Sequence, residues 1–161
     1  MDSAMSIDGA RESFRMSGDF ILRITEDLSD EEWFRRPAEN MNHMAWIVGH
    51  IIWARGATVS RLGGQYEEPW LSKFARGTKL QDQHEYPSPA ELKQSLRDVS
   101  KALTAAFENV SPETLQAPVE RIPSADGKVS GMTNFLALHD TYHVGQASYL
   151  RCWMGKKSPM G

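Results

Sequence analysis

The sequence lacks several features that would direct it to particular classes of protein. Cys152 is the single cysteine among 161 residues, so an internal disulfide and a cysteine-rich zinc module are excluded. We expect this thiol to be buried near a helix end, as free cysteines commonly are. No stretch approaches the roughly 20 apolar residues that span a bilayer, and residues 1–16 have neither the basic region nor the apolar core of a secretory signal. We therefore expect a cytoplasmic protein without a membrane partner.

The sequence also lacks any basic run. The formal net charge is -3 and the two signs are interspersed, which does not favour a nucleic acid as a partner. Apolar residues make up 40% and charged residues 24% of the chain, a mixture typical of globular proteins. A chain of this length can bury a core of its own. We expect residues 1–161 to form one domain.

Four segments carry apolar residues at steps of three and four, which is the period of an amphipathic helix. These segments are residues 6–28, 41–62, 88–109 and 130–154. The third begins at Ser88, a good N-cap that is followed by a proline in the first turn. Helices of this length extend about 30 Å, and four of them make a four-helix bundle the simplest all-α architecture.

The long connection between helices 2 and 3, residues 63–87, bears on the topology. It is long enough to run back along the whole bundle, so that helix 3 can be parallel to helix 2. Links with many aromatic residues usually cover a face of the fold or the mouth of a site. The aromatic residues of this link are Tyr66, Trp70, Phe74 and Tyr86.

Two histidines, His139 and His143, are four residues apart in the last predicted helix. This spacing sets their side chains about 5–6 Å apart on one face, which suits chelation of one ion. An open zinc-type site needs a third protein ligand, and His50 is our first choice because it lies on an apolar helix face. His43 would lie about 10 Å away along the helix axis, and His84 resembles an exposed loop residue.

A histidine on an apolar face is more often held by an ordinary hydrogen bond than by a metal. Three buried imidazoles without a shared partner would each need a separate hydrogen bond. The pair also lacks the intervening glutamate of the zinc proteases. We expect a divalent transition metal, zinc or nickel, although the sequence alone does not select between metals that imidazole accepts.

Two stretches resemble the signatures of the DinB-like superfamily. They are NHMAWIVGHIIWARG at 42–56 and LHDTYHVGQASYLRCWMGK at 138–156. The first is an apolar helix whose motif ends in Gly-His, and the second contains H-x-x-x-H-x-G-Q. The resemblance implies a four-helix bundle with up-down-down-up topology and a divalent metal held by three histidines, which map onto His50, His139 and His143.

Three neighbours of these histidines are candidates for supporting roles. Gly145 is unfavourable in a helix, so we expect it to permit the close approach of a neighbouring helix. Gln146 can hydrogen-bond a ligand or a metal-bound water, or it can make a simple contact between helices. Asp140 can orient an imidazole, although one position after His139 it points off the metal face, and a solvated surface acid is the simpler interpretation.

The resemblance implies transfer of a small thiol, such as bacillithiol or mycothiol, to a small-molecule electrophile, because some relatives are thiol S-transferases. The first alternative is a metal-dependent hydrolase, for which Asp140 and Glu85 are the candidate bases. The second is a non-enzymatic, metal-stabilised binding or dimerisation module, because Trp46, Trp53 and Trp70 can form the interface of a homodimer as readily as a pocket wall.

Overall fold

The computed structural model describes residues 5–159, and within this range every regular element is helical. The long helices are α1 (Asp8–Thr25), α2 (Met44–Arg61), α3 (Pro89–Asn109) and α5 (Val129–Trp153). The short elements are the helix α4 (Pro112–Gln116) and the 3-10 turns η1 (Glu32–Phe34), η2 (Leu71–Phe74) and η3 (Gln83–Glu85). The all-α prediction is confirmed, and the four predicted segments each contain most of one long helix.

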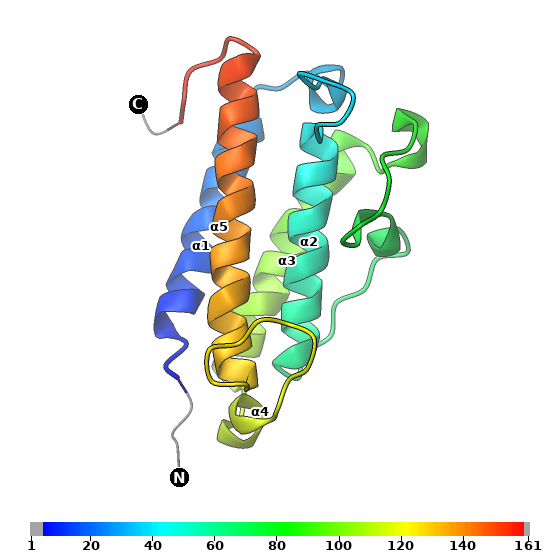
Figure 1. The fold of residues 1–161 in the computed structure, drawn as a ribbon. Helices are drawn as coiled ribbons and strands as arrows, with labels where there is room; N and C mark the ends of the chain where they lie inside the picture. The colour runs from blue at the N-terminus through cyan, green and yellow to red at the C-terminus, as the bar shows by residue number, and fades with distance from the viewer. Residues whose placement is uncertain (1–4, 160–161) are drawn as a thin grey trace.

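The four long helices lie side by side (Figure 1). Helix α1 packs against α3 and α5, and α2 packs against the same two helices. Helices α1 and α5 run in one direction, whereas α2 and α3 run in the other (Figure 1). The connection between α2 and α3 returns along the outside of α2, and its turn η2 packs against that helix.

Local capping explains where several elements begin. Ser88 and Glu91 form the reciprocal capping box that starts α3. Ser29 and Glu32 make the same two hydrogen bonds, 2.8 and 3.3 Å long, at the start of η1. Ser111 caps α4, a helix that the sequence analysis missed because five residues are too few to show a period.

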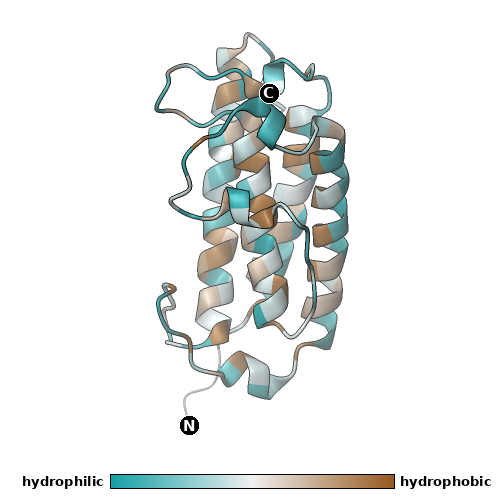
Figure 2. Ribbon diagram, turned by 90° about the vertical axis from the view of Figure 1, so that its right-hand side faces the viewer, coloured by the Kyte–Doolittle hydropathy of each residue, from teal (hydrophilic) through white to brown (hydrophobic). Residues whose placement is uncertain are grey.

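The aromatic residues of the connection cover the core, as expected. Phe74 is 0% exposed and Tyr86 is 7% exposed, and both belong to the main apolar cluster. Tyr66 and Trp70 are partly buried against the same cluster. The connections themselves are mainly hydrophilic, whereas the apolar residues concentrate along the helices (Figure 2). None of the helices in the described range has the length and apolar character needed to cross a bilayer.

Two expectations about the last helix are wrong. Cys152 is exposed rather than buried. The helical period of the predicted segment 130–154 also predicts an apolar stripe, but two of its members, Tyr142 and Trp153, are 63% and 42% exposed. The full predicted stripe is Phe135, His139, Tyr142, Gln146, Leu150 and Trp153. The buried face of α5 passes through Asp140, His143, Ala147 and Leu150, so only Leu150 of that stripe is buried. Each helical position turns the side chain by about 100°, so Tyr142, next to the buried His143, and Cys152, next to the buried Arg151, point toward solvent.

Candidate metal centre

The first histidine of the site is fixed by a contact between α2 and the following connection. His50 is 3% exposed, and its Nδ1 lies 2.7 Å from the backbone oxygen of Phe74. Because a carbonyl oxygen only accepts, Nδ1 carries the proton and the lone pair of Nε2 is free. The ring of Phe74 occupies the space above Gly49, where a Cβ would lie 2.3 Å from it. The Gly-His pair of the sequence motif therefore has a physical reason.

The other two histidines come from α5. His139 and His143 face the same direction, as the i,i+4 spacing predicts. Nδ1 of His143 lies 2.7 Å from Oε1 of Gln146, whose amide nitrogen in turn donates to the hydroxyl of Tyr142. Gln146 therefore orients the imidazole of His143. The alternative that we considered for Gln146 was a simple contact between helices. A Cβ added at Gly145 would meet no atom within 4 Å, so the expectation that this glycine permits the close approach of a neighbouring helix is wrong.

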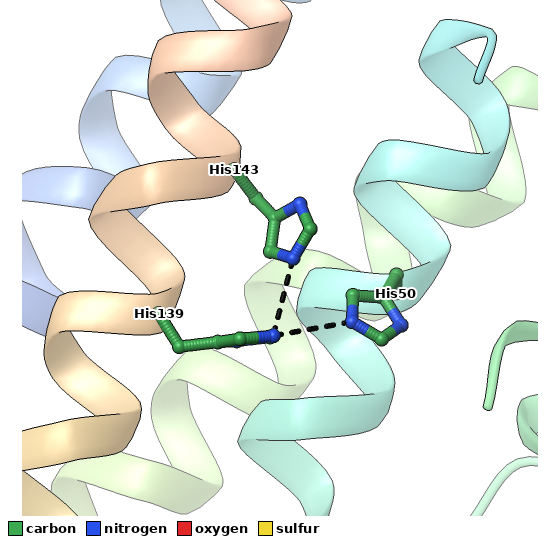
Figure 3. Close-up of side chains that lie close together, drawn as sticks. All are labelled: His50, His139 and His143. Carbon is green, nitrogen blue, oxygen red and sulfur yellow. Dashed lines mark hydrogen bonds between the residues drawn. The ribbon is translucent and has the colours of Figure 1, made fainter. Parts of the chain in front are cut away.

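The three rings converge (Figure 3). Nε2 of His139 lies 3.3 Å from Nε2 of His50 and 3.1 Å from Nε2 of His143. One ligand atom from each ring lies within 4.8 Å of the others. A tetrahedral ion with metal–nitrogen distances of about 2.0–2.1 Å has an edge of about 3.3–3.4 Å between ligand atoms. The two separations between Nε2 atoms, 3.3 and 3.1 Å, are close to that edge.

The hydrogen-bonding pattern also suits a cation. Two free lone pairs, those of His50 and His143, point at the same nitrogen of His139, and that nitrogen can carry only one proton. Nδ1 of His139 is buried without a hydrogen-bond partner in the described part of the chain. Unprotonated imidazole nitrogens that face one another repel, and a cation between them removes this repulsion. The donor set fits a divalent transition metal.

The protonation state favours metal binding. Burial lowers the pKa of His50, His139 and His143 from its usual value near 6.5. The neighbouring histidines lower these pKa values further, and Arg76 does so for His139. The rings are thus neutral near pH 7, which is the form that ligates metal.

A cavity of about 720 Å³ opens onto the three histidines. Trp46 and Trp53 line it. Both indole rings stack on the imidazole of His50, with ring centroids 4.7 and 5.2 Å from the centroid of that imidazole. Both indoles therefore form part of a pocket wall, which is one of the two roles that we considered for them. Trp70 packs edge-on against Phe74 instead, at 5.4 Å.

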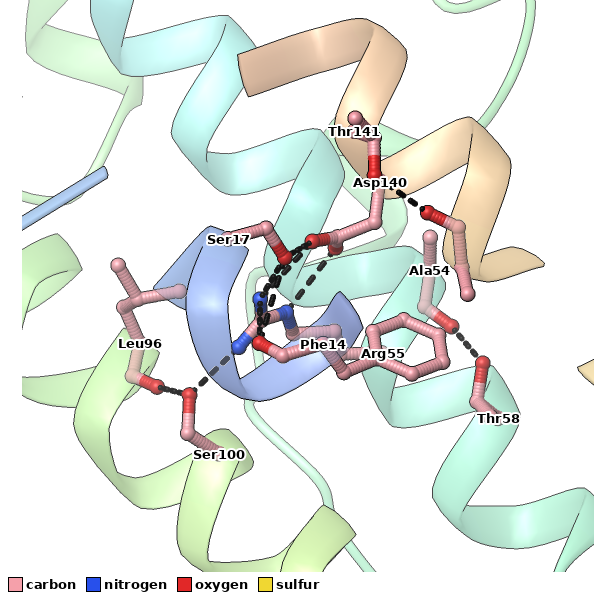
Figure 4. Close-up of polar contacts among 10 residues, drawn as sticks. Phe14, Ser17, Ala54, Arg55, Thr58, Leu96, Ser100, Asp140 and Thr141 are labelled. Carbon is pink, nitrogen blue, oxygen red and sulfur yellow. Dashed lines mark hydrogen bonds and ion pairs between the residues drawn. The ribbon is translucent and has the colours of Figure 1, made fainter. Parts of the chain in front are cut away.

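Asp140 is neither a surface acid nor a residue of the cavity. It is 1% exposed and forms a bidentate ion pair with Arg55, through Nε at 3.0 Å and Nη2 at 2.9 Å. Ser17 donates to the same carboxylate, and the remaining guanidinium nitrogen donates to Ser100 at 2.7 Å (Figure 4). The pair joins α1, α2, α3 and α5 behind the histidines.

The sequence analysis missed Arg55. A signal was present, because this arginine stands within an apolar helical run in which a lone charge needs a buried partner. Asp140 nevertheless acts on the site at a distance, since its negative charge raises the pKa of His139 and His143 against the larger effect of burial.

The remaining candidates lie elsewhere. Nδ1 of His43 accepts a hydrogen bond from the backbone of Trp46 and so caps α2, which agrees with its rejection as a ligand. His84 is exposed on η3. Glu85 is exposed too, and it pairs with Lys73 at 3.4 Å rather than lining the cavity of the histidines.

The fold and site thus define a helical protein with a buried cluster of three histidines able to hold a metal. The chain belongs to the DinB superfamily, whose family model matches residues 14–147. A solved structure described as a conserved protein from Enterococcus faecalis is similar in fold, with a TM-score of 0.70 and 15% sequence identity. The similarity covers 92% of this chain and 96% of that one. No curated protein matches this chain.

Proposed function

We propose that this protein is a metal-dependent enzyme in which His50, His139 and His143 hold one divalent ion, zinc or nickel. The reaction that we favour is transfer of a low-molecular-weight thiol to a small electrophile. The frame of the site would be an up-down-down-up four-helix bundle. The observation that supports the proposal most directly is the convergence of the three Nε2 atoms, two of them with free lone pairs.

Three neutral imidazoles leave the charge of a divalent ion uncompensated. When bound, such an ion would supply Lewis acidity that lowers the pKa of a coordinated thiol and yields the nucleophile at neutral pH. The backbone oxygen of Phe74 and the amide of Gln146 hold two of the rings in the tautomer that offers Nε2. In the reaction, a carbon–sulfur bond forms, the bond to the leaving group breaks, and the thiol proton passes to solvent.

The cavity favours thiol transfer over hydrolysis. Hydrolysis needs a general base near the attacking water, and of the described residues that line the cavity none is aspartate or glutamate. Both acids that we considered as bases are engaged elsewhere, Asp140 with Arg55 and Glu85 with Lys73. A thiol, by contrast, loses its proton more easily than water does. We further propose a cytoplasmic location, where small thiols are kept reduced.

One observation favours the second candidate, a binding module that forms a homodimer. Large side chains are exposed along α5 on both sides of Gly145, whose own surface is open. They are Leu138 at 67%, Tyr142 at 63%, Tyr149 at 68% and Trp153 at 42% exposure. A second copy of this helix could pack closely at the glycine. Sedimentation at several protein concentrations tests this, and a monomer at all concentrations would exclude it.

Metal analysis tests the proposed site. Protein purified without a metal-affinity column should contain close to one transition-metal ion per chain. Replacing His143→Ala should abolish binding, whereas His84→Ala, a matched change at an exposed histidine, should leave the metal content unaltered. Equal metal content in the two variants would contradict the site.

Activity assays then separate the reactions. A thiol transferase should conjugate a model electrophile only when both metal and thiol are present. Turnover of esters or amides without thiol would favour the hydrolase. Failure in both panels, together with a concentration-dependent dimer, would favour the binding module.

A further inference from the structure

Two arginines from separate loops stand at the cavity that holds the histidines. Arg76 follows η2, and Arg121 lies in the loop between α4 and α5. Because the histidines are neutral near pH 7, these arginines are the only charged side chains among the described residues that line this cavity. Both are exposed, and within residues 5–159 neither forms an ion pair with a carboxylate.

The loop that carries Arg76 is fixed to the helices. Phe74, two residues before it, is 0% exposed, and its ring fills the space over Gly49. The hydroxyl of Thr78 donates to the backbone oxygens of Lys73 and Ala75, at 3.0 and 2.8 Å. The arginine is therefore presented by a short turn whose two ends are both anchored.

The loop that carries Arg121 is fixed as firmly. The amides of Val119 and Val129 donate to the oxygens of Gly127 and Ala117, both at 3.0 Å, and so close the loop across its base. The carboxylate of Asp126 accepts from the amide of Gly131 at 3.0 Å and ties the loop to the first turn of α5.

The backbone of Arg121 is itself unusual. Its φ angle is 64°, and within the described range no other non-glycine residue has a positive φ. Side chains with a Cβ adopt this region at a cost in energy, and such residues gather at binding sites. The hydrogen bonds that close and anchor the loop hold Arg121 in this conformation, and the residue lines the cavity.

We propose that Arg76 and Arg121 together bind the carboxylate or phosphate group of the substrate, with its reactive end at the histidines. The orientation of the reactive end rests on the proposed function, whereas the anion site does not. Guanidinium groups bind such anions through paired, charge-assisted hydrogen bonds. Since no acidic side chain of the described lining offsets the two positive charges, a small ligand gains most by bringing the negative charge itself.

Titration of the full chain with simple anions tests the anion site directly. The protein is first stripped of metal with 1,10-phenanthroline, a neutral chelator, and dialysed. Inorganic phosphate and, separately, acetate are then added while chemical shifts of the indole groups of Trp46 and Trp53, which line the cavity, are followed. We expect saturable binding of at least one anion that weakens as salt is raised.

Three variants interpret the titration. Arg76→Gln removes one charge, and Arg121→Asn removes the other while keeping a residue that tolerates positive φ. Each should weaken anion binding about tenfold, the scale of one charge-assisted hydrogen bond. Arg97→Gln, a matched change at an exposed position of α3, should not. Absence of anion binding, or equal affinity in all the variants, would overturn the proposal.

A kinetic comparison distinguishes this proposal from the proposed function. With metal and 2-mercaptoethanol present, chloroacetate and chloroacetamide present the same carbon and leaving group but differ in charge. The preference for chloroacetate should fall about tenfold in the two arginine variants. Metal binding and turnover without any such preference would refute the anion site and leave the function standing. Arginine-dependent anion binding in a chain that takes up no metal would refute the proposed function and leave the anion site standing.

Discussion

The contact between Gly49 and Phe74 yields a sharp prediction, because one methyl group should disturb the metal site from outside it. In Gly49→Ala the new Cβ would lie 2.3, 2.3 and 2.5 Å from three ring carbons of Phe74. Ordinary carbon contacts are about 3.5–4.0 Å, so the ring must retreat by about 1 Å or more. It has little room, since Trp70 and Tyr86 pack against it with centroids 5.4 and 5.2 Å away.

The retreat of the ring should also move the carbonyl that orients His50. Overpacking of this kind costs about 1–3 kcal/mol of stability, and loss of an orienting hydrogen bond lowers metal affinity by about 10–100-fold. Gly145→Ala is the matched control, because its Cβ would meet nothing within 4 Å. That change should raise stability by up to about 1 kcal/mol, the helix propensity gained.

Two measurements decide the question. Urea denaturation gives the free energy of unfolding for each variant, and competition with a chromophoric chelator gives the affinity for zinc. Gly49→Ala should lower both the free energy of unfolding and the affinity for zinc, whereas Gly145→Ala should lower neither. If Gly49→Ala bound zinc as tightly as the unaltered protein, the carbonyl of Phe74 would not be what holds His50 in place.

Three further predictions concern other residues. Burial and the nearby charge of Arg36 lower the pKa of His43 to about 4. The unfolded chain therefore binds a proton at this histidine below about pH 6.5, whereas the folded protein does not until about pH 4. As a result, up to about 3 kcal/mol of stability should be lost as the pH falls from 6.5 to 4. His43→Asn keeps a capping side chain, and denaturation at several pH values should show a smaller loss; parallel curves would contradict this. Arg55→Met should lower the free energy of unfolding by about 3–5 kcal/mol in a denaturant titration, because it leaves a buried carboxylate unpaired. Adding Asp140→Leu should recover most of that loss. If the losses of stability in the two single variants simply added in the double variant, the two residues would not be coupled. Gln146→Leu should lower zinc affinity about 10–100-fold in the chelator assay with unchanged circular dichroism, and an unchanged affinity would remove Gln146 from the site.

The helices were predictable because their buried faces repeat along the sequence. The predicted segment 88–109 differs by one residue from α3, whose start is fixed by the Ser88 cap. The expected ends of α1 were less accurate, with residues 6–28 predicted and Asp8–Thr25 observed. Apolar residues continue beyond Thr25 into a turn that packs on the core, so their spacing no longer reports a helix.

The candidate ligands were predictable for the same reason, and their surroundings were not. A helix repeat places His139 and His143 on one face whatever the rest of the chain does. The partner of Asp140 comes from a helix 85 residues away in sequence, and the carbonyl that holds His50 comes from a loop with no periodicity. Such contacts depend on how distant segments meet, which composition and spacing do not encode.

The histidines of the cavity come from helices and its arginines come from loops, and this difference affects how the protein can change in evolution. The imidazoles project from α2 and α5, which are braced by the ion pair of Arg55 and Asp140, whereas Arg76 and Arg121 project from loops. Loop residues can be exchanged without disturbing the braced helices. A relative could thus become selective for a neutral or a cationic compound by altering two side chains, while its three histidines stayed in place.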